Sequence, residues 1–396
     1  MMLRKDLPIL IYRGTEVCYN VLNAMAGQWE RAFRRAGYEV LVYSEPEEGL
    51  NALLPYLDRD YAAVIGFQTY LYEIFLESRG HYLHEYLRGP KFNVLFDHPI
   101  WHRAHLEKLP PEVYVLTHDR NYKAFIEQHF PAVSGTFILP PAGCGEPLLR
   151  ENPGQDSRSG IVFLGTYTDY RHFLPVIRKA DRPIVRRVAL RFLGLLHRNP
   201  ELTAEAGMER ALKECGVAYN AEVFLNWLEL CTPVLYCIMS YYRERIVRAI
   251  LSRGITLNVY GESWELLAGH LPKGEASKLN ILPAVPYEEN VKELAHYKLS
   301  LNVMAWHKDG YTERIINSMQ QGAVVVSDES RYLKEHFTEG EMHLYDLKEP
   351  EALADWIAMA LTEADERIGR MAASAARMAA AETWDARVKE LEGLDL

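Results

Sequence analysis

Apolar runs of strand length alternate with amphipathic segments through most of the chain. The first run, Ile9 to Tyr12, is followed by a helical pattern from Tyr19 to Ala36 and a second apolar run, Val40 to Tyr43. Further helical segments are expected near Leu71 to Leu87, and the other early apolar runs lie at 62–66, 93–96, 113–116 and 136–139. Repeated strands and helices of these lengths predict an α/β fold with a parallel sheet covered on both faces.

A connection rich in proline, glycine and small polar residues separates this alternation from a second one. It comprises 140–143 and 151–157, which show no apolar periodicity. The pattern therefore predicts two Rossmann-like domains. The expected parts are an N-terminal domain at 1–145, a C-terminal domain at 155–380 with a helical insertion at about 175–236, and a final helix within 381–396.

Length and composition narrow the class of protein. A chain of 396 residues is long enough for two domains of ordinary size. An apolar fraction of 48% and a charged fraction of 25% are typical of soluble globular proteins. The net charge of −10 argues against general nucleic-acid binding, because phosphate contacts need an excess of Lys and Arg. We interpret the basic run from Arg178 to Arg191 as a solvated face that an anionic acceptor could use.

Cysteine, histidine and hydropathy patterns favour a cytoplasmic protein without a metal centre. The five cysteines form no CxxC pair, and their odd number argues against a disulfide framework. The 14 histidines include no HExxH spacing, so no structural metal is expected. No signal peptide is seen at the N-terminus. Val223 to Tyr242 is the most membrane-like segment, but Glu229 and Pro233 interrupt it, which predicts a buried or broken helix.

The segment from Leu299 to Asp328 predicts an anion-binding site. It contains an apolar run, the loop Lys308 to Gly310, a short helix that Thr312 would cap, and a second apolar run ending in Ser327-Asp328. The free N–H groups and the positive dipole end of that helix favour an anion, and Gly310 lets a ligand approach the backbone. In a strand, loop, helix and strand unit, a nucleotide diphosphate usually lies at this point.

This segment also resembles the donor site of the retaining GT-B glycosyltransferases, and more closely their CgeB-like branch. Asp309-Gly310-Tyr311-Thr312 matches the acidic residue and glycine-aromatic turn of that signature, and Asn317 stands where the family has a second carboxylate. The resemblance implies that Asp309 contacts the sugar hydroxyls, that Asn317 contacts the ribose, and that Arg314 lies near the donor phosphates.

Two other loops resemble donor-site loops of the same family. After the apolar run Ile161 to Leu164 comes Gly165-Thr166, and Arg171 stands where the family has a basic residue that pairs with the phosphates. The resemblance also implies that the backbone near Pro283 and Val285 holds the nucleotide base. Trp264 is interpreted as either a core residue or a stacking platform.

In the first domain, Asp97-His98-Pro99 is the loop with the most reactive side chains. His98 could act as a general base toward an acceptor hydroxyl, with Asp97 orienting it or accepting the proton itself. The alternative interpretation is that Asp97 and Pro99 shape a turn and His98 packs beside it.

The resemblance implies a GT-B glycosyltransferase, with two Rossmann-like domains facing across a cleft and the final helix crossing back to the first domain. It would transfer a sugar from a UDP- or GDP-type donor to a carbohydrate, glycolipid or protein acceptor. It would use no metal and no cofactor besides this donor substrate. Two other functions stay open at this stage: a nucleotide-sugar epimerase and a non-catalytic nucleotide-sugar-binding protein.

Overall fold

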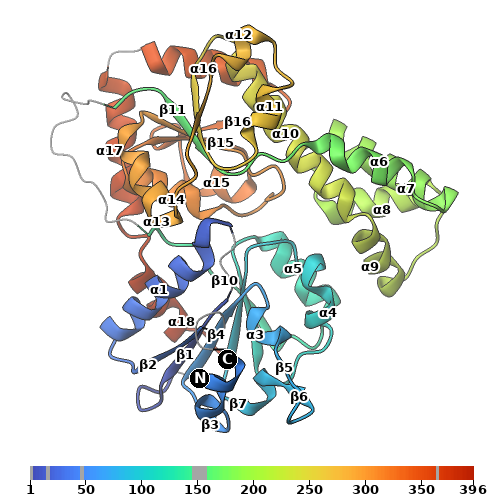
Figure 1. The fold of residues 1–396 in the computed structure, drawn as a ribbon, viewed down its shortest axis with the longest axis vertical. Helices are drawn as coiled ribbons and strands as arrows, with labels where there is room; N and C mark the ends of the chain where they lie inside the picture. The colour runs from blue at the N-terminus through green and yellow to red at the C-terminus, as the bar shows by residue number, and fades with distance from the viewer. Residues whose placement is uncertain (1–2, 15–17, 45–48, 145–157, 363–364) are drawn as a thin grey trace. The chain divides into compact units, whose positions relative to one another are not determined.

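The chain divides into two compact α/β units (Figure 1). The computed structural model describes residues 3–14, 18–44, 49–144, 158–362 and 365–396. Unit 1 consists of Met1–Cys144, Pro286–Glu288 and Ala380–Leu396, and unit 2 of Gly145–Val285 and Glu289–Ala379. The end of the chain therefore belongs to unit 1. Most of the expected interdomain connection, 145–157, lies outside the described residues.

Unit 1 is built on a six-stranded parallel sheet in the order β10-β9-β8-β4-β1-β2. Its chain order reverses between β1 and β4, which is the kind of position where doubly wound sheets bind ligands. The strands are β1 (Ile9–Arg13), β2 (Val40–Ser44), β4 (Ala63–Phe67), β8 (Lys91–Leu95), β9 (Val113–Thr117) and β10 (Gly135–Ile138). The helices are α1 (Val21–Arg35), α3 (Tyr70–Glu73), α4 (Arg103–Leu106), α5 (Arg120–His129) and α18 (Trp384–Glu392).

The helical segments expected near Leu71 to Leu87 are confirmed only at the two ends of this stretch, as α3 and as a 3-10 helix at Leu83–Tyr86. The chain leaves the helical conformation at Ile74, directly after α3. It then forms the hairpin β5 (Phe75–Leu76) and β6 (His81–Tyr82), and β7 (Leu87–Arg88) pairs with β3 (Arg59–Asp60). Gly80 takes a positive φ of 72° beside that hairpin, a conformation that a helix interior does not contain.

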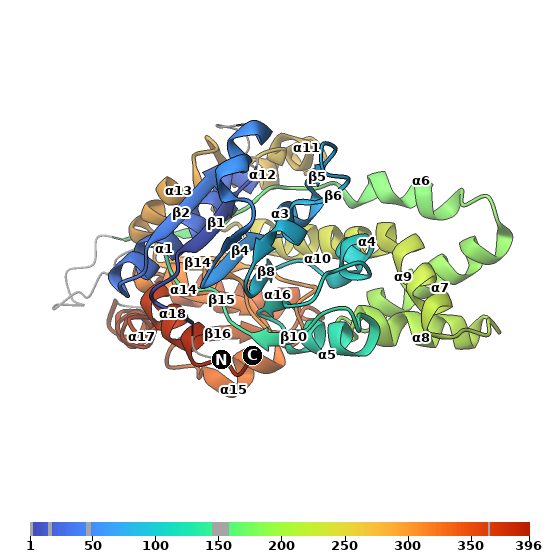
Figure 2. The same ribbon diagram turned by 90° about the horizontal axis from the view of Figure 1, so that it is seen from below.

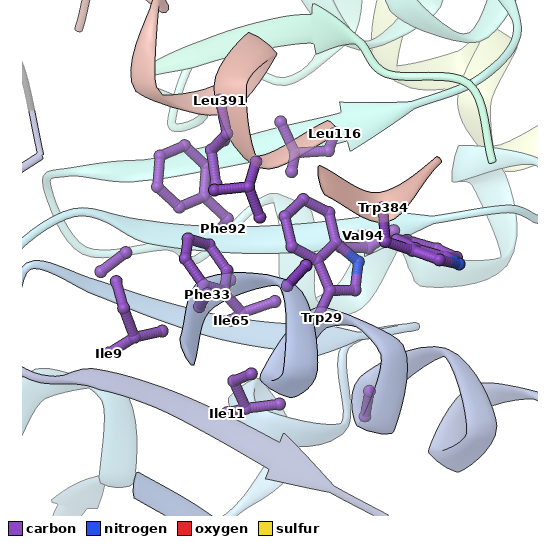
Figure 3. Close-up of a cluster of buried hydrophobic side chains, with 14 of the residues drawn as sticks. Ile9, Ile11, Trp29, Phe33, Ile65, Phe92, Val94, Leu116, Trp384 and Leu391 are labelled. Atoms are coloured by element: carbon purple, nitrogen blue, oxygen red, sulfur yellow. The ribbon is translucent and has the colours of Figure 1, made fainter. Parts of the chain in front are cut away.

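The core of unit 1 joins the sheet to helices from both ends of the chain (Figure 3). Trp29 of α1 lies 5.5 Å from Trp384 of α18 and 5.3 Å from Phe33, measured between ring centroids. The guanidinium of buried Arg387 extends this packing, because its Nε donates to the Pro140 carbonyl at 2.7 Å. The last helix is therefore anchored on unit 1 by aromatic burial and by a hydrogen bond.

Unit 2 contains a second six-stranded parallel sheet, in the order β13-β12-β11-β14-β15-β16. The strands are β11 (Ile161–Leu164), β12 (Leu257–Tyr260), β13 (Leu279–Leu282), β14 (Leu299–Asn302), β15 (Val324–Asp328) and β16 (Met342–Tyr345). Strands β11, β14 and β15 are buried at every position, as expected for a sheet covered on both faces. The chain order reverses between β11 and β14, where Phe163 is paired with Leu301.

The helices of unit 2 form two groups. The helices near the sheet are α11 (Trp264–Ala268), α12 (Lys273–Ala276), α13 (Tyr287–Glu293), α14 (Glu313–Gln320), α15 (Arg331–His336), α16 (Pro350–Thr362) and α17 (Asp365–Ala379). The first two residues of α13 belong to unit 1. The others make up a helical arm, seen well in Figure 2, of α6 (Phe173–Arg178), α7 (Pro183–Arg198), α8 (Ala204–Glu214), α9 (Ala221–Leu230) and the start of α10 (Thr232–Ser252). Helix α10 contacts both α7 of the arm and α16 beside the sheet, so one helix connects the arm to the sheet.

The membrane-like segment of the sequence is a broken helix, as expected. Pro233 stands in the first turn of α10, a position that tolerates proline, and α9 and α10 are bent by 50° at the break. Over the described residues, no single helix is long and apolar enough to span a membrane, although this bent pair passes by length and composition.

Candidate functional site

The loops at the carboxyl ends of β11 and β14 meet where the chain order of the unit 2 sheet reverses. Ligands of doubly wound sheets bind at such a switch point. Three segments supply side chains here: the loop after β11, the segment from the end of β14 to the start of α14, and one turn of α10.

Asp328, the last residue of β15, holds the loop that follows β14. Its two carboxylate oxygens accept hydrogen bonds from the backbone N–H groups of Met304 and Ala305, each at 2.7 Å. Ala305 has a positive φ of 54°, and the ring of Trp306 follows it next to His307. The terminal Ser327-Asp328 of the sequence motif therefore has a structural role, because it fixes the loop leading to α14.

The beginning of α14 is held by its neighbours. The Ser330 hydroxyl donates to the Gly310 carbonyl at 2.7 Å, and the Arg331 N–H donates to the Lys308 carbonyl at 2.8 Å. These bonds hold the loop that contains the buried Asp309, which lies three residues before the N-cap Thr312.

Thr312 occupies the predicted N-cap position but makes no capping hydrogen bond. Its hydroxyl donates instead to Oδ1 of Asn302 at 3.2 Å. The N–H groups of the first turn are therefore not capped by Thr312, which leaves this helix end suited to an anionic ligand.

Two arginines converge beside this helix end. Nη1 of Arg314 donates to Oδ1 of Asn302 at 2.8 Å, and its guanidinium lies 5.6 Å from the ring of Phe163. Arg243, from α10, lies 5.5 Å from the same ring, and its Nη1 donates to the Thr166 carbonyl at 2.6 Å. Both guanidinium groups therefore pack on Phe163, the third residue of β11.

The charge of this arginine pair is incompletely compensated. Burial, and then the nearby charge of Arg314, lower the pKa of Arg243 to about 10. The Nε atom of Arg243 is buried and has no hydrogen-bond partner. Two like charges that are partly removed from water favour a bound anion with several acceptor oxygens, such as a diphosphate.

The loop after β11 is packed tightly against the loop after β12. Nε1 of the fully buried Trp264 donates to the Gly165 carbonyl at 2.8 Å, so Trp264 is a core residue that supports the loop. Gly261 has a φ of +145°, and a Cβ atom there would lie 2.4 Å from the same carbonyl oxygen. Only glycine fits at this close approach, which sets the position of Gly165 and Thr166.

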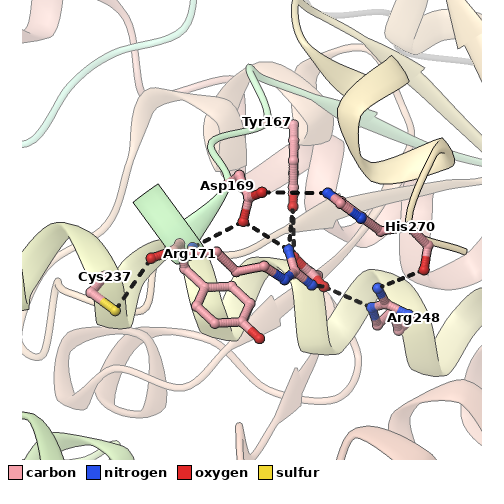
Figure 4. Close-up of polar contacts among 8 residues, drawn as sticks. Tyr167, Asp169, Arg171, Cys237, Arg248 and His270 are labelled. Atoms are coloured by element: carbon pink, nitrogen blue, oxygen red, sulfur yellow. Dashed lines mark hydrogen bonds and ion pairs between the residues drawn. The ribbon is translucent and has the colours of Figure 1, made fainter. Parts of the chain in front are cut away.

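Arg171 does not join the arginine pair. It belongs to a separate charged cluster (Figure 4), where its Nη2 contacts Oε1 of Glu244 at 2.5 Å and its Nη1 contacts Asp169 at 2.7 Å. Glu244 also accepts from the Tyr167 hydroxyl at 2.6 Å and from Nε of Arg248 at 2.7 Å. The guanidinium of Arg171 is thus engaged by two carboxylates, a structural arrangement that differs from the phosphate contact suggested by the sequence.

The remaining donor-site residues differ in their exposure. Asn317 is in the second turn of α14 with 1% of its surface exposed, and buried Tyr311 packs against Tyr332. Pro283 is exposed after β13, whereas the Val285 carbonyl already accepts from Nδ2 of Asn290 at 3.0 Å. Contacts of Asn317 with a ribose and of Val285 with a base stay predictions.

In unit 1, Asp97 and His98 follow β8 and have different surroundings. Oδ2 of Asp97 accepts from the Gln68 side chain at 2.5 Å, and burial raises the pKa of this carboxyl despite that bond. Nδ1 of His98 accepts from the Ile100 N–H at 3.2 Å, and its ring packs against Tyr122. An imidazole that accepts at Nδ1 carries its proton at Nε2 when neutral, so in this tautomer His98 is a donor and Asp97 is the better base.

The sequence prediction omitted Arg243 and Asn302 as site residues. Asn302 ends β14 and orients both Thr312 and Arg314 through one oxygen. Arg243 comes from a helix about 70 residues away from Arg314 along the chain, so no local motif joins the two. The only sequence signal was a pattern in α10, Arg243-Glu244-Arg245, without an assigned role. No group of three or more His, Cys, Asp or Glu side chains within the described ranges is arranged to hold a metal ion.

Comparison with known proteins gives one family match and many structural ones. Residues 243–393 match the family model described as glycosyl transferase-like. Sucrose-phosphate synthase from Thermosynechococcus elongatus aligns over 97% of each chain with a TM-score of 0.56 and 11% identity. HepE from Anabaena, in complex with UDP and glucose, aligns over 98% of this chain and 100% of that chain with a TM-score of 0.51 and 11% identity.

The alignment to S. aureus TarM has a TM-score of 0.49 at 11% identity and covers 87% of this chain, which spans only 58% of the TarM chain. No curated protein sequence matches the chain. The full-length structural likenesses confirm the expected fold class: the chain has two Rossmann-like units of the GT-B type. The stretch that matches the glycosyl transferase-like family model, residues 243–393, includes both arginines of the pair.

Proposed function

We propose that the protein transfers a glycosyl group from a nucleoside diphosphate sugar, and that unit 2 binds the donor. The observation that supports this most directly is the convergence of Arg243 and Arg314 on Phe163, beside the start of α14. A sugar nucleotide has the diphosphate that such a site favours. UDP is the first nucleotide to test, because HepE, which has the same fold, was solved with UDP and glucose.

In this mechanism the nucleoside diphosphate is the leaving group. It gains negative charge as the bond between the anomeric carbon of the sugar and the diphosphate oxygen breaks. Arg243, Arg314 and the N–H groups of the first turn of α14 would stabilise that charge in a preorganised setting. Asp309, in the loop before that turn, would contact hydroxyls of the sugar. The proposal uses no metal ion, and turnover in the presence of a chelator tests this part.

The donor should be identified by the response of the protein to a panel of nucleotides. We expect UDP or GDP to raise the melting temperature of the protein. Without an acceptor, the matching nucleotide sugar should be hydrolysed slowly by water, which releases the nucleoside diphosphate. Saturating ligand at about 100 times its Kd adds about 2.7 kcal/mol to stability, which a thermal shift assay resolves. If no nucleotide stabilises the protein, the proposed donor site is wrong. Conversion of the sugar without release would indicate an epimerase, and binding without release or transfer a non-catalytic protein.

Asp97 is our candidate for the base that accepts the proton of the acceptor hydroxyl. Its raised pKa and its bond to Gln68 suit a carboxylate that takes up a proton during the reaction. Asp97→Asn should lower kcat by about a hundredfold or more, since general bases contribute at least that much. His98→Asn should keep most of the activity, because an asparagine oxygen can accept the Ile100 N–H in place of Nδ1. Steady-state kinetics with the identified donor test this, and the reverse ranking of the two variants would assign the base to His98.

A further inference from the structure

The helical arm has a surface that the proposed transfer reaction does not use. Residues of helices α6, α7, α9 and α10 and of the loop before α7 line a mainly apolar cavity of about 480 Å³. Two apolar side chains among those that line it are unusually exposed: Val176 is 58% exposed and Leu230 is 54% exposed. Tyr236, which stacks on Phe173, is 40% exposed on the adjoining face of α10. Large exposed apolar groups around one cavity mark a contact surface rather than ordinary solvent-facing positions.

Basic side chains adjoin this cavity. Arg182 lines it together with Val176 and Leu230, and Asp181 contributes the one carboxylate among the lining residues. Arg186 lies one helical turn further along α7 and so on the same face, and Arg178 and Lys179 directly follow the cavity residue Ile177. All four are exposed, and none forms an ion pair with a residue that the structure describes. Arg191 of α7, in contrast, forms an ion pair with Glu214.

We propose that this surface docks on a lipid bilayer that contains anionic lipids. The combination of inserted apolar groups and flanking cations is the one that holds amphipathic helices at such an interface, and Tyr236 adds an aromatic group suited to the headgroup region. The net charge of −10 does not oppose this contact, because charges more than about 10 Å away are largely screened at 0.1 M salt.

Vesicle sedimentation tests the proposal with the full chain, independently of any activity. Wild type should bind vesicles of phosphatidylcholine with phosphatidylglycerol, and should bind phosphatidylcholine alone much less. Binding should weaken as sodium chloride is raised. The double variant Arg182→Gln, Arg186→Gln should lower the partition coefficient about thirtyfold, since each cation near an anionic surface contributes about 1 kcal/mol. The matched control Arg331→Gln, Arg370→Gln removes the same charge from exposed positions elsewhere in unit 2 and should bind as wild type does.

The apolar contribution is tested separately. Val176→Ser, Leu230→Ser should reduce binding at least about tenfold, because two exposed side chains lose the chance to enter the interface. Leu266→Ser, Met359→Ser changes two other exposed apolar residues and should have no effect. The proposal fails if wild type ignores anionic vesicles, or if the arm and control variants bind equally. It also fails if light scattering shows a dimer that the arm variants disrupt, because the surface would then bind a second copy of the chain.

Discussion

Arg243→Gln and Arg314→Gln should each lower kcat for sugar transfer by about a hundredfold or more. Losing one preorganised donor to a developing negative charge typically has an effect of this size. The double variant should lose less than the product of the two effects, because residues that act on one group are not additive. Steady-state kinetics with the donor identified by the nucleotide panel measure these effects.

The same variants should not reduce the stability of the free protein. The charge of Arg314 lowers the pKa of Arg243 in the free structure, so the pair is repulsive when no anion is bound. Removing one charge relieves that repulsion, and the melting temperature without ligand should stay constant or rise while stabilisation by the nucleotide is lost. A binding site commonly shows this trade-off, in which a substitution that raises stability lowers the function of the site. Arg370→Gln, an exposed surface change, is the control. A large loss of stability with normal turnover would show instead that the pair is structural.

The local patterns of the sequence predicted the strands and the loops that follow them. Apolar runs such as Leu299 to Asn302 and Val324 to Asp328 are strands because both faces of the sheet are covered, and this leaves a clear signal in residue type. The position of Asp309 and Gly310 before a helix followed from the same reasoning. A polar stretch between two strands of a parallel sheet can be located without knowledge of tertiary contacts.

The partners of the arginines could not be predicted in this way. Arg171 follows a glycine-containing loop after a strand, and nothing local shows that Glu244, 73 residues later, takes its guanidinium. Arg243 stands next to Glu244 on α10, but successive residues of a helix point about 100° apart, so one faces the charged cluster and the other faces Phe163. Thr312 similarly has the right residue type for a cap but bonds Asn302. Which polar groups pair is decided by tertiary packing.

Glu244→Gln should destabilise the protein by about 1–3 kcal/mol, the usual cost of removing the acceptor of charge-assisted hydrogen bonds whose donors are partly exposed. Only 3% of the Glu244 side chain is exposed, and its two oxygens accept from Arg171, Arg248 and Tyr167. A neutral amide offers one acceptor, so Arg171 keeps only Asp169 and Arg248 loses its carboxylate partner. Urea unfolding at neutral pH measures the change, and Glu209→Gln, at an exposed position of the same unit, should shift it little.

The effect of this variant should depend on pH in a defined direction. Burial alone would raise the pKa of Glu244, but hydrogen bonds from Arg171, Tyr167 and Arg248 outweigh it and hold the pKa below the ordinary value. A carboxyl with a lowered folded-state pKa contributes stability above its unfolded pKa of about 4.3 and loses it as the pH falls through the folded pKa. The difference between wild type and Glu244→Gln should therefore shrink in acid, and a difference that is constant with pH would contradict this origin.

Arg171→Gln completes the test, because it separates the two roles that the sequence and the structure give to this residue. If Arg171 serves the charged cluster, its loss should destabilise the protein in the same manner as Glu244→Gln and leave the affinity for the nucleotide close to normal. If it binds the donor phosphates, Arg171→Gln should instead resemble Arg314→Gln, with reduced turnover and an unchanged melting temperature. The bonds to Glu244 and Asp169 favour the first outcome, since the two carboxylates offset the charge of the guanidinium and occupy the N–H donors that a diphosphate would need.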